Sequence, residues 1–343
     1  MYHIIETFAK LYLCETNVFN ISKYQQKEDI TIKKTAFISI IGRPSSGKSS
    51  LLNNLCGQKI SIVTPSPQTT RNCIRGIISN ERGQLVFLDT PGFHHSERKF
   101  NRQLRGLIRN SLESADLILY VVDVTRKPGP EEEALMDIVT GSELPVIIAL
   151  NKVDICPESG TASGTASGTA SGPESGTAAD IRQLLKLRQQ SVSYLMRKVS
   201  ALTGSGLEEL KSDIFNCAPE GEALYPSDFY TDQSPEFRIS EIIREQAMLR
   251  SRQELPHAIY VDVHEIEVRE EQRHLLIRAH ICVESKSQIG LVVGRNGSGI
   301  REIRKESQRE AGKIFPYRIY LDLRVKCSPR WRRNEHITRK LIQ

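Results

Sequence analysis

The chain has 343 residues, 39% of them hydrophobic and 26% charged, a length and composition sufficient for about two globular domains. It contains no apolar run of roughly 18 residues, which excludes an integral membrane protein. Seven scattered cysteines without a CxxC pair argue against a disulfide-stapled secreted protein and against a zinc site, and fit a reducing compartment. The net charge of +6 is uneven, because residues 285–343 carry +10 and the rest −4, which indicates either contact with a polyanion or a solvated basic tail.

Residues 35–150 contain four short apolar runs that are rich in β-branched side chains and separated by helix-length segments. The runs lie at 36–41, 85–88, 117–122 and 146–150. Continuous rather than alternating apolar runs are typical of strands buried on both faces of a parallel sheet. The pattern predicts an α/β domain with helices on both faces of a mostly parallel sheet. Helical periodicity at 181–195 and a last strand at 198–201 are expected to close it.

The remaining segments suggest how the chain is divided. Residues 1–34 show no clear period and are interpreted as an N-terminal extension. Residues 157–178 repeat Ser-Gly-Thr-Ala units, whose small polar side chains bury too little surface to offset their ordering entropy, so a flexible surface insertion is expected there. The predicted boundaries are 35–217 for the α/β domain, 218–237 for a linker, 238–333 for a small α+β domain and 334–343 for a C-terminal tail.

The strongest motif lies between the first predicted strand and a following helix. It satisfies GxxxxGK[ST] with Gly42, Arg43, Pro44, Ser45, Ser46, Gly47, Lys48 and Ser49. Its glycines let backbone amides wrap phosphates at a helix N-terminus, where the helix dipole also favours anions. Lys48 is expected to reach the β- and γ-phosphates, and the Ser49 hydroxyl is expected to ligate Mg²⁺.

A second motif predicts which base is bound. It follows a buried strand, at the sheet edge where nucleotides bind, and consists of Asn151, Lys152, Val153 and Asp154. The Asp154 carboxylate can accept hydrogen bonds from N1–H and the exocyclic amine of guanine, which adenine does not offer. Backbone contacts from three residues are expected to complete the pocket: Ser200, Ala201 and Leu202. GTP is therefore the predicted nucleotide.

Two further loops are expected to respond to the γ-phosphate. One consists of Asp89, Thr90, Pro91, Gly92 and Phe93; its carboxylate can hold Mg²⁺ through water and its glycine amide can sense the γ-phosphate. The other, residues 67–71, supplies a hydroxyl for the metal, and Thr70 is preferred over Thr69. The predicted Mg²⁺ ligands are Ser49, Thr70 and Asp89. The predicted catalytic groups are Lys48, Thr70 and Gly92.

The predicted α+β domain runs helix, strand, strand, helix, helix, strand and carries a GxxG turn between its last two helices. The turn consists of Gly294, Arg295, Asn296 and Gly297, and three basic residues follow it: Arg301, Arg304 and Lys305. Glycine lets a nucleic-acid backbone come close, and the basic residues add charge, so this element order predicts single-stranded RNA binding. Tyr317, Tyr320 and Trp331 can stack bases or lie in the core, and the core is favoured.

Together these motifs resemble the Era-like (TrmE-Era-EngA) family of bacterial GTPases with a C-terminal KH domain. The resemblance covers about residues 35–333 and includes the runs at 225–233, 241–245 and 255–257. It implies a P-loop GTPase domain, a type II KH domain and slow GTP hydrolysis with Mg²⁺. It also implies binding to the 3′ end of 16S ribosomal RNA, a role in 30S subunit assembly, and a cytoplasmic protein partly attached to the inner face of the cell membrane. A monomer is the default expectation.

Two positions depart from wider GTPase patterns. Era-like proteins usually have Asn at the position of Ser45, where in related GTPases it helps to ligate a stimulating K⁺; a Ser would coordinate more weakly, which leaves potassium stimulation open. Phe93 stands where Ras-like proteins use Gln to orient the attacking water. No side chain is therefore an obvious catalytic base, and slow intrinsic turnover is expected.

Two other functions stay open from the sequence. One is a nucleotide-gated RNA-binding protein with little hydrolysis, a hypothesis that Ser45 keeps open. The other is a membrane-attached regulatory GTPase whose basic C-terminal end binds anionic lipid. The GxxG turn weighs against the second, because lipid binding needs positive charge but not that turn.

Overall fold

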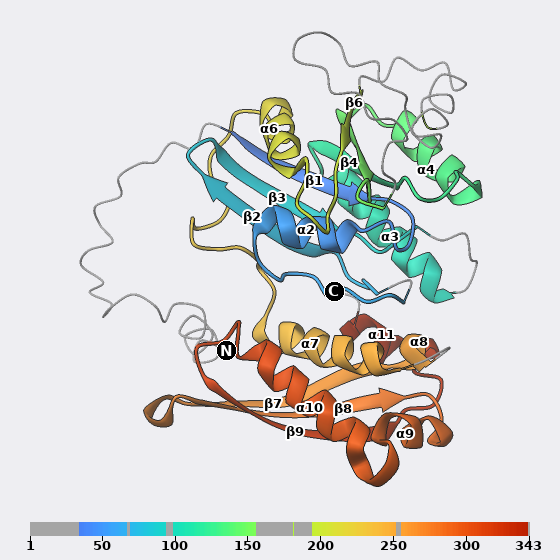
Figure 1. Cartoon of the computed structure of the whole chain (residues 1–343), viewed down its shortest axis with the longest axis vertical. Helices are drawn as coiled ribbons and strands as arrows, with labels where there is room; N and C mark the ends of the chain where they lie inside the picture. The colour runs from blue at the N-terminus through green and yellow to red at the C-terminus, as the bar shows by residue number, and fades with distance from the viewer. Residues whose placement is uncertain are drawn as a thin grey trace. The chain divides into compact units, whose positions relative to one another are not determined.

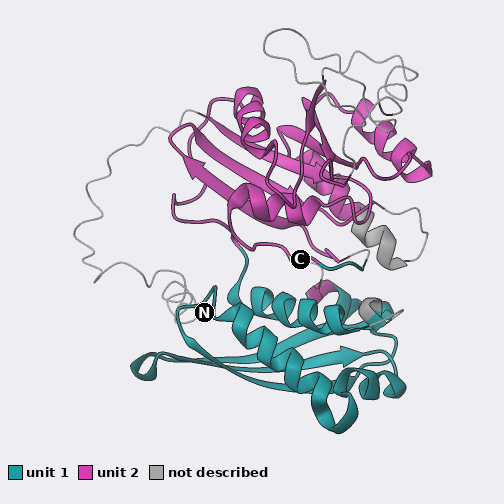
Figure 2. Cartoon of the chain, in the orientation of Figure 1, with its two compact units in different colours: residues 1–30, 64–66, 233–338 teal, residues 31–63, 67–232, 339–343 magenta. Residues whose placement is uncertain are grey.

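The computed structural model describes residues 34–66, 69–93, 99–155, 181, 194–251 and 255–341 (Figure 1). Residues 1–33 of the predicted extension and the predicted insertion at 157–178 therefore lie outside the described residues. The chain forms two compact units (Figure 2). The N-terminal unit takes its described residues from 31–63, 67–232 and 339–343, and the C-terminal unit takes them from 64–66 and 233–338.

The N-terminal unit is built on a mostly parallel sheet. Its described strands are β1 (Thr35–Ile41), β2 (Ile74–Asn80), β3 (Gly83–Asp89), β4 (Leu117–Asp123), β5 (Val146–Asn151) and β6 (Tyr194–Lys198). Its described helices are α2 (Lys48–Cys56), α3 (Lys99–Glu113), α4 (Pro130–Thr140) and α6 (Leu207–Cys217). The strand order is β2-β3-β1-β4-β5-β6, and only the β2–β3 pair is antiparallel (Figure 1). Every residue of β3, β4 and β5 is buried, so both faces of the sheet are covered, as the continuous apolar runs predict.

The sequence analysis predicts no strand between residues 42 and 84, yet the structure has β2 there. Gly76 interrupts its apolar run, and this interruption hides the strand from a pattern based on hydrophobicity. A Cβ at Gly76 would lie 2.6 Å from Cδ1 of Leu52 in α2, so the glycine makes room for the helix that packs against this strand.

The last strand of the sheet begins and ends earlier than predicted. The predicted strand at 198–201 is wrong, because β6 spans Tyr194–Lys198 and a turn begins at Ser200, whose carbonyl accepts from Gly204 N at 2.9 Å. The side chains of Val199, just before this turn, and of Ala201 within it are both buried, and they imitate a strand pattern. The predicted helix at 181–195 lies mostly outside the described residues, and its last two residues belong to β6.

The segment that precedes residue 233, predicted as a linker, is hydrogen-bonded to the N-terminal unit. The fully buried Gln84 on β3 accepts from the backbone amides of Leu224 and Tyr225 at 2.8 and 2.9 Å, and donates to the Tyr225 carbonyl at 2.8 Å. Arg75 on β2 forms an ion pair with Asp232 at 2.6 Å. This segment is therefore attached to the sheet as far as Asp232.

The C-terminal unit has the predicted order of helix, two strands, two helices and strand. Its described helices are α7 (Pro235–Arg250), α8 (Leu255–Ala258), α9 (Lys286–Val293) and α10 (Ser298–Ala311), with short turns η2 (Glu270–Gln272), η3 (Arg295–Gly297) and η4 (Trp331–Arg333). The last helix, α11 (Glu335–Leu341), begins in this unit, and its residues from Arg339 onward belong to the N-terminal unit. Its strands are β7 (Tyr260–Arg269), β8 (His274–Val283) and β9 (Arg318–Cys327). The sheet order is β7-β8-β9, antiparallel then parallel. Helices α7, α9 and α10 pack over the sheet and share its apolar core (Figure 1).

Trp331 and Tyr317 belong to the core of the C-terminal unit rather than to its surface. Trp331 is completely buried, its indole N–H donates to the Ala258 carbonyl at 2.9 Å, and its ring lies 5.0 Å from that of Tyr260. Tyr317 is 7% exposed, whereas Tyr320 is 36% exposed. None of the described helices combines the length and the apolar composition needed to cross a bilayer.

Candidate functional site

The phosphate loop, residues 42–49, leads from β1 into α2. Gly47 is the N-cap of α2 with φ at +95°, and a Cβ there would lie 2.2 Å from the side-chain nitrogen of Asn151. Only glycine fits this close approach and this backbone conformation. The Asn151 side chain donates to the Ser46 carbonyl at 2.9 Å and accepts from Ala201 N at 2.9 Å. Asn151 thus joins the phosphate loop to the predicted guanine loop.

Lys48 is the first residue of α2, and its ammonium group lies inside the phosphate loop. The side chain is buried, and Nζ donates to the carbonyls of Gly42 at 3.0 Å and Arg43 at 2.9 Å. Burial lowers the pKa of Lys48 to about 8, although the nearby Asp89 carboxylate acts in the opposite direction. A desolvated cation held by neutral carbonyls gains most from an anionic ligand.

Three side chains that carry oxygen atoms lie together beside this lysine, and their chemistry decides whether a metal ion fits there. Ser49 Oγ donates to Asp89 Oδ2 at 2.7 Å and lies 2.9 Å from Thr70 Oγ1. Burial raises the pKa of Asp89, and its Oδ1 is buried without a hydrogen-bond partner among the described residues. Mg²⁺ prefers hard oxygen donors of this kind, so the set fits this ion. Among the expected residues of this region, Pro67 and Gln68 lie outside the described residues.

The loop that follows β3 packs against the phosphate loop through its glycine. A Cβ at Gly92 would lie 2.7 Å from Cα of Pro44, so the two backbones are in direct contact. The hydroxyl of Thr90 donates to the Ile40 carbonyl of β1 at 2.7 Å and is turned into the fold, and Pro91 is buried. Phe93 is 9% exposed and packs in the apolar core, so it offers no group to an attacking water.

The predicted guanine loop is held together by side-chain contacts. Asp154 Oδ1 accepts from the Ser200 hydroxyl at 2.5 Å. Val153 packs against the core, whereas Leu202 is 81% exposed. The second carboxylate oxygen of Asp154 makes no hydrogen bond with the described residues, as expected of an acceptor for a base. The structure therefore brings together the two segments predicted to recognise guanine.

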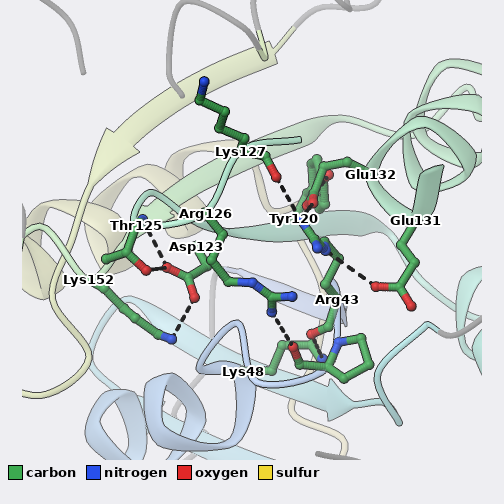
Figure 3. Close-up of polar contacts among 11 residues, drawn as sticks. Arg43, Lys48, Tyr120, Asp123, Thr125, Arg126, Lys127, Glu131, Glu132 and Lys152 are labelled. Atoms are coloured by element: carbon green, nitrogen blue, oxygen red, sulfur yellow. Dashed lines mark hydrogen bonds and ion pairs between the residues drawn. The ribbon is translucent and has the colours of Figure 1, made fainter. Parts of the chain in front are cut away.

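Asp123 is a site residue that the sequence analysis misses. It ends β4 beside Asn151 of β5, and its carboxylate accepts from Lys152 Nζ at 2.6 Å and from the Thr125 hydroxyl at 2.6 Å (Figure 3). Burial acts to raise the pKa of Asp123, but the hydrogen bonds from Lys152 and Thr125 outweigh it and lower that pKa. Asp123 thus fixes the predicted base-binding lysine, which has φ at +70°. Its position at the carboxyl end of a buried strand was the available clue.

In the C-terminal unit, the GxxG turn lies between α9 and α10 as predicted. Gly294 and Gly297 have φ at +72° and +73°, and a Cβ at Gly294 would lie 2.8 Å from the Gly299 nitrogen. Arg295 and Asn296 at the tip are exposed. The turn therefore presents backbone and two polar side chains to the solvent at the N-terminus of a fourteen-residue helix.

The basic residues after this turn form one exposed surface. Those predicted to bind RNA are exposed: Arg295, Arg301, Arg304 and Lys305. None of these four has an ion pair with a described acidic side chain, whereas Arg309 further along α10 pairs with Glu306 at 2.7 Å. The buried Ile303 anchors the helix between them. Unpaired cations next to a glycine turn are suited to the phosphates of single-stranded RNA.

Two family models match this chain. The model described as 50S ribosome-binding GTPase matches residues 37–152, and the model described as KH domain matches residues 254–332. Curated relatives are similar over nearly their whole length. GTPase Era of Treponema pallidum (strain Nichols) is 43% identical over 88% of this chain and 95% of its own, and GTPase Era of Borreliella burgdorferi (strain ZS7) is 40% identical over 90% and 99%.

Solved structures of the same kind are also similar. One is a crystal structure of Era in complex with MgGDPNP and nucleotides 1506–1542 of 16S ribosomal RNA, at a TM-score of 0.79 and 32% identity, covering 90% of this chain and 98% of that one. Another is a single-residue variant of Aquifex aeolicus Era bound to GDP and AlF4⁻, at a TM-score of 0.77 and 32% identity, covering 89% of this chain and 98% of that one. With 40% and 43% identity to relatives that it covers almost completely, this chain belongs to the Era family of GTPases, which join a P-loop GTPase domain to a C-terminal KH domain.

Proposed function

We propose that this GTPase is a molecular switch that binds the 3′ end of 16S ribosomal RNA and acts in assembly of the 30S subunit. The observation that carries the proposal is the convergence of Ser49, Thr70 and Asp89 oxygens beside the buried Lys48. This arrangement supports binding of a magnesium nucleotide at residues from the start of α2, the loop before β2 and the end of β3. A change in the nucleotide can therefore move the loop that carries Thr70 and the loop that follows Asp89.

The nucleotide would lie across the residues predicted for it. The amides of the phosphate loop and Lys48 would bind the phosphates, and Asp154 would accept from the guanine ring. Ser49, Thr70 and Asp89 would hold Mg²⁺, which when bound neutralises charge on the phosphates. The role of Asp123 would be to orient Lys152 alongside the base.

Hydrolysis would depend on stabilisation of charge rather than on a side-chain base. Lys48 and the Gly92 amide are the groups that would stabilise negative charge on the γ-phosphate oxygens. Phe93 is turned into the core and contributes no proton acceptor. Slow intrinsic turnover follows, and the loss of the γ-phosphate would release Thr70 and Gly92.

Potassium stimulation depends on Ser45. This residue has φ at +62°, a conformation that Asn tolerates better than most residues, so Ser45→Asn is expected to fold and to add an amide oxygen to the loop. We expect the ratio of turnover in potassium to turnover in sodium to be larger in this variant than in the wild type. Steady-state phosphate release in matched salts measures both ratios, and equal ratios would contradict the expectation.

The RNA target is proposed from the relatives together with the GxxG surface. The RNA in the related Era complex is a segment of 16S ribosomal RNA, which belongs to the small subunit. This favours the 30S subunit, although the broader family model carries the description of a 50S-binding GTPase. Cytoplasmic residence, with a fraction at the inner face of the cell membrane, belongs to the same proposal and rests on the family alone. A monomeric state is the default expectation.

Equilibrium binding to an RNA matching the organism's own 16S 3′ end tests the proposal. We expect tighter binding with a GTP analogue than with GDP, and no binding of a scrambled RNA. The double variant Arg301→Ala/Arg304→Ala is expected to bind at least about tenfold more weakly and to reduce the slope of log affinity against log salt by about 1 to 2.

A control for the loss of one positive charge elsewhere in the same unit is Arg324→Ala on β9, where Arg324 pairs with Asp322 at 3.2 Å. It should bind the RNA almost as the wild type does. Equal affinity in the GTP and GDP states would contradict the switch, and equal affinity for the scrambled RNA would contradict the target.

A further inference from the structure

A buried polar network joins the phosphate loop to β4 and α4. Arg43, the second residue of the loop, donates to Glu132 Oε2 at 2.6 Å, and the Tyr120 hydroxyl donates to Glu132 Oε1 at 3.0 Å (Figure 3). Tyr120 is completely buried and Glu132 is 2% exposed. Among the described residues, one carboxylate oxygen of Glu132 thus accepts from Arg43 and the other accepts from Tyr120.

The network fixes the Arg43 side chain on several sides. Its guanidinium also donates to the Lys127 carbonyl at 3.1 Å and to Glu131 at 3.4 Å. Glu131 and Glu132 lie in the first turn of α4, where the helix dipole stabilises a carboxylate. Burial acts to lower the pKa of Arg43, and the two glutamates outweigh this effect and raise it. The Arg43–Glu132 ion pair is thus largely buried, and further contacts with Glu131 and Lys127 hold the guanidinium in place.

The backbone that Arg43 holds contacts both groups assigned to transition-state stabilisation. The Arg43 carbonyl accepts from Lys48 Nζ at 2.9 Å. The next residue, Pro44, lies in backbone contact with Gly92, and its carbonyl accepts from Arg126 at 3.4 Å. A shift of Arg43 would therefore move the surroundings of Lys48 and of the Gly92 amide together.

The other half of the phosphate loop is held by different contacts. Its Ser46 carbonyl accepts from Asn151, and its Ser49 hydroxyl donates to Asp89. These residues, with the amides at the start of α2, would bind the phosphates that GTP and GDP share. The second half of the loop, from Ser46 to Ser49, is thus expected to bind the nucleotide, whereas the Arg43 side chain in the first half is held by Glu132.

We propose that Arg43, Glu132 and Tyr120 are positioning residues for GTP hydrolysis. They hold the Arg43–Pro44 backbone, and through it Lys48 and Gly92, in the arrangement that stabilises charge on the γ-phosphate. This inference rests on the proposed nucleotide site and adds residues that touch no reacting atom. Small displacements of such groups lower the rate of the chemical step far more than they weaken binding.

The test uses three variants of the full chain: Glu132→Gln, Arg43→Lys and Tyr120→Phe. Single-turnover hydrolysis of GTP gives the rate of the chemical step, and equilibrium binding of radiolabelled GDP gives affinity. We expect the rate to fall about tenfold or more in the first two variants and about threefold in the third, with GDP affinity within about threefold of the wild type. Hydrogen exchange at the Gly92 amide with a GTP analogue bound should become faster in the same order.

A matched control is Arg197→Lys, which replaces the guanidinium group of another arginine in the same unit by an ammonium group. Arg197 on β6 pairs with Asp213 of α6, away from the phosphate loop. This variant should keep the wild-type rate. If Glu132→Gln does not fold, the two variants that retain the Glu132 charge carry the test.

The outcomes separate this inference from the proposed function. A rate that stays at the wild-type value in the folded variants would overturn the positioning role. A parallel loss of rate, GDP affinity and thermal stability would show that the network only supports the fold, which also overturns it. A wild-type chain that binds GDP but never hydrolyses GTP would instead overturn the proposed function, and then unchanged Gly92 exchange in the variants would overturn the inference as well.

Discussion

Replacing Lys48 by methionine is expected to lower GTP turnover at least about 100-fold. Removing a preorganised group that stabilises charge in a transition state typically lowers a rate by this much. The ammonium group is buried and, within the part of the chain that the structure describes, donates to the carbonyls of Gly42 and Arg43, so we expect the phosphates of the nucleotide to be its main favourable partners. Methionine keeps the length and volume of the side chain and removes the charge. Nucleotide affinity should fall with the rate.

The stability of the free protein should change little in this variant. Lys48→Met removes the cost of a desolvated cation and also two hydrogen bonds, and we expect the free energy of unfolding to stay within about 1 kcal/mol of the wild type. Thermal unfolding without nucleotide, together with phosphate release, measures both quantities. Lys211→Met, which removes a lysine paired with Glu208 on the surface of α6, is the control and should keep full activity. Retained turnover in the Lys48 variant would contradict the assigned role.

Replacing Asp154 by asparagine is expected to weaken GTP binding at least about 100-fold. The carboxylate is predicted to accept two hydrogen bonds from guanine, and a hydrogen bond to a charged group contributes about 1.5–3 kcal/mol. Xanthine has a carbonyl where guanine has its exocyclic amine, so the amide N–H of the new side chain can donate to it. The variant should therefore bind xanthosine triphosphate more tightly than GTP.

This reversal separates base recognition from a general defect. Competition of both nucleotides against radiolabelled GDP or xanthosine diphosphate measures it directly. Asp228→Asn makes the same charge change at an exposed position outside the site and should leave the preference for GTP intact. A variant that loses both nucleotides equally would indicate that Asp154 acts mainly by holding Ser200, its hydrogen-bond partner at 2.5 Å.

The elements that the sequence predicts well are those with a strong local pattern. The buried strands β1, β3, β4 and β5 are continuous apolar runs, and the phosphate loop is a fixed spacing of glycine, lysine and serine between a strand and a helix. Where the local pattern misleads, tertiary packing decides. Gly76 lies in a strand because α2 packs over it, and Val199 and Ala201 are buried beyond the end of β6.

The candidate site shows the same division. Lys48 and Asp154 belong to motifs whose chemistry is visible in the sequence. Glu132 and Tyr120 do not, because nothing in a run of three glutamates says which one turns inward, and a tyrosine in an apolar strand has the pattern of a core residue. Their role emerges only when β4 and α4 bring them to Arg43.

Trp331 gives the molecule a built-in optical reporter. It is the single tryptophan of the chain, and it is completely buried in the C-terminal unit. The predicted nucleotide-binding loops belong to the N-terminal unit. Its fluorescence therefore follows the unfolding of one unit, while nucleotide binding stabilises the other by mass action. Whether added GDP delays the loss of native tryptophan emission in denaturant then reveals how far the two units unfold as one cooperative body.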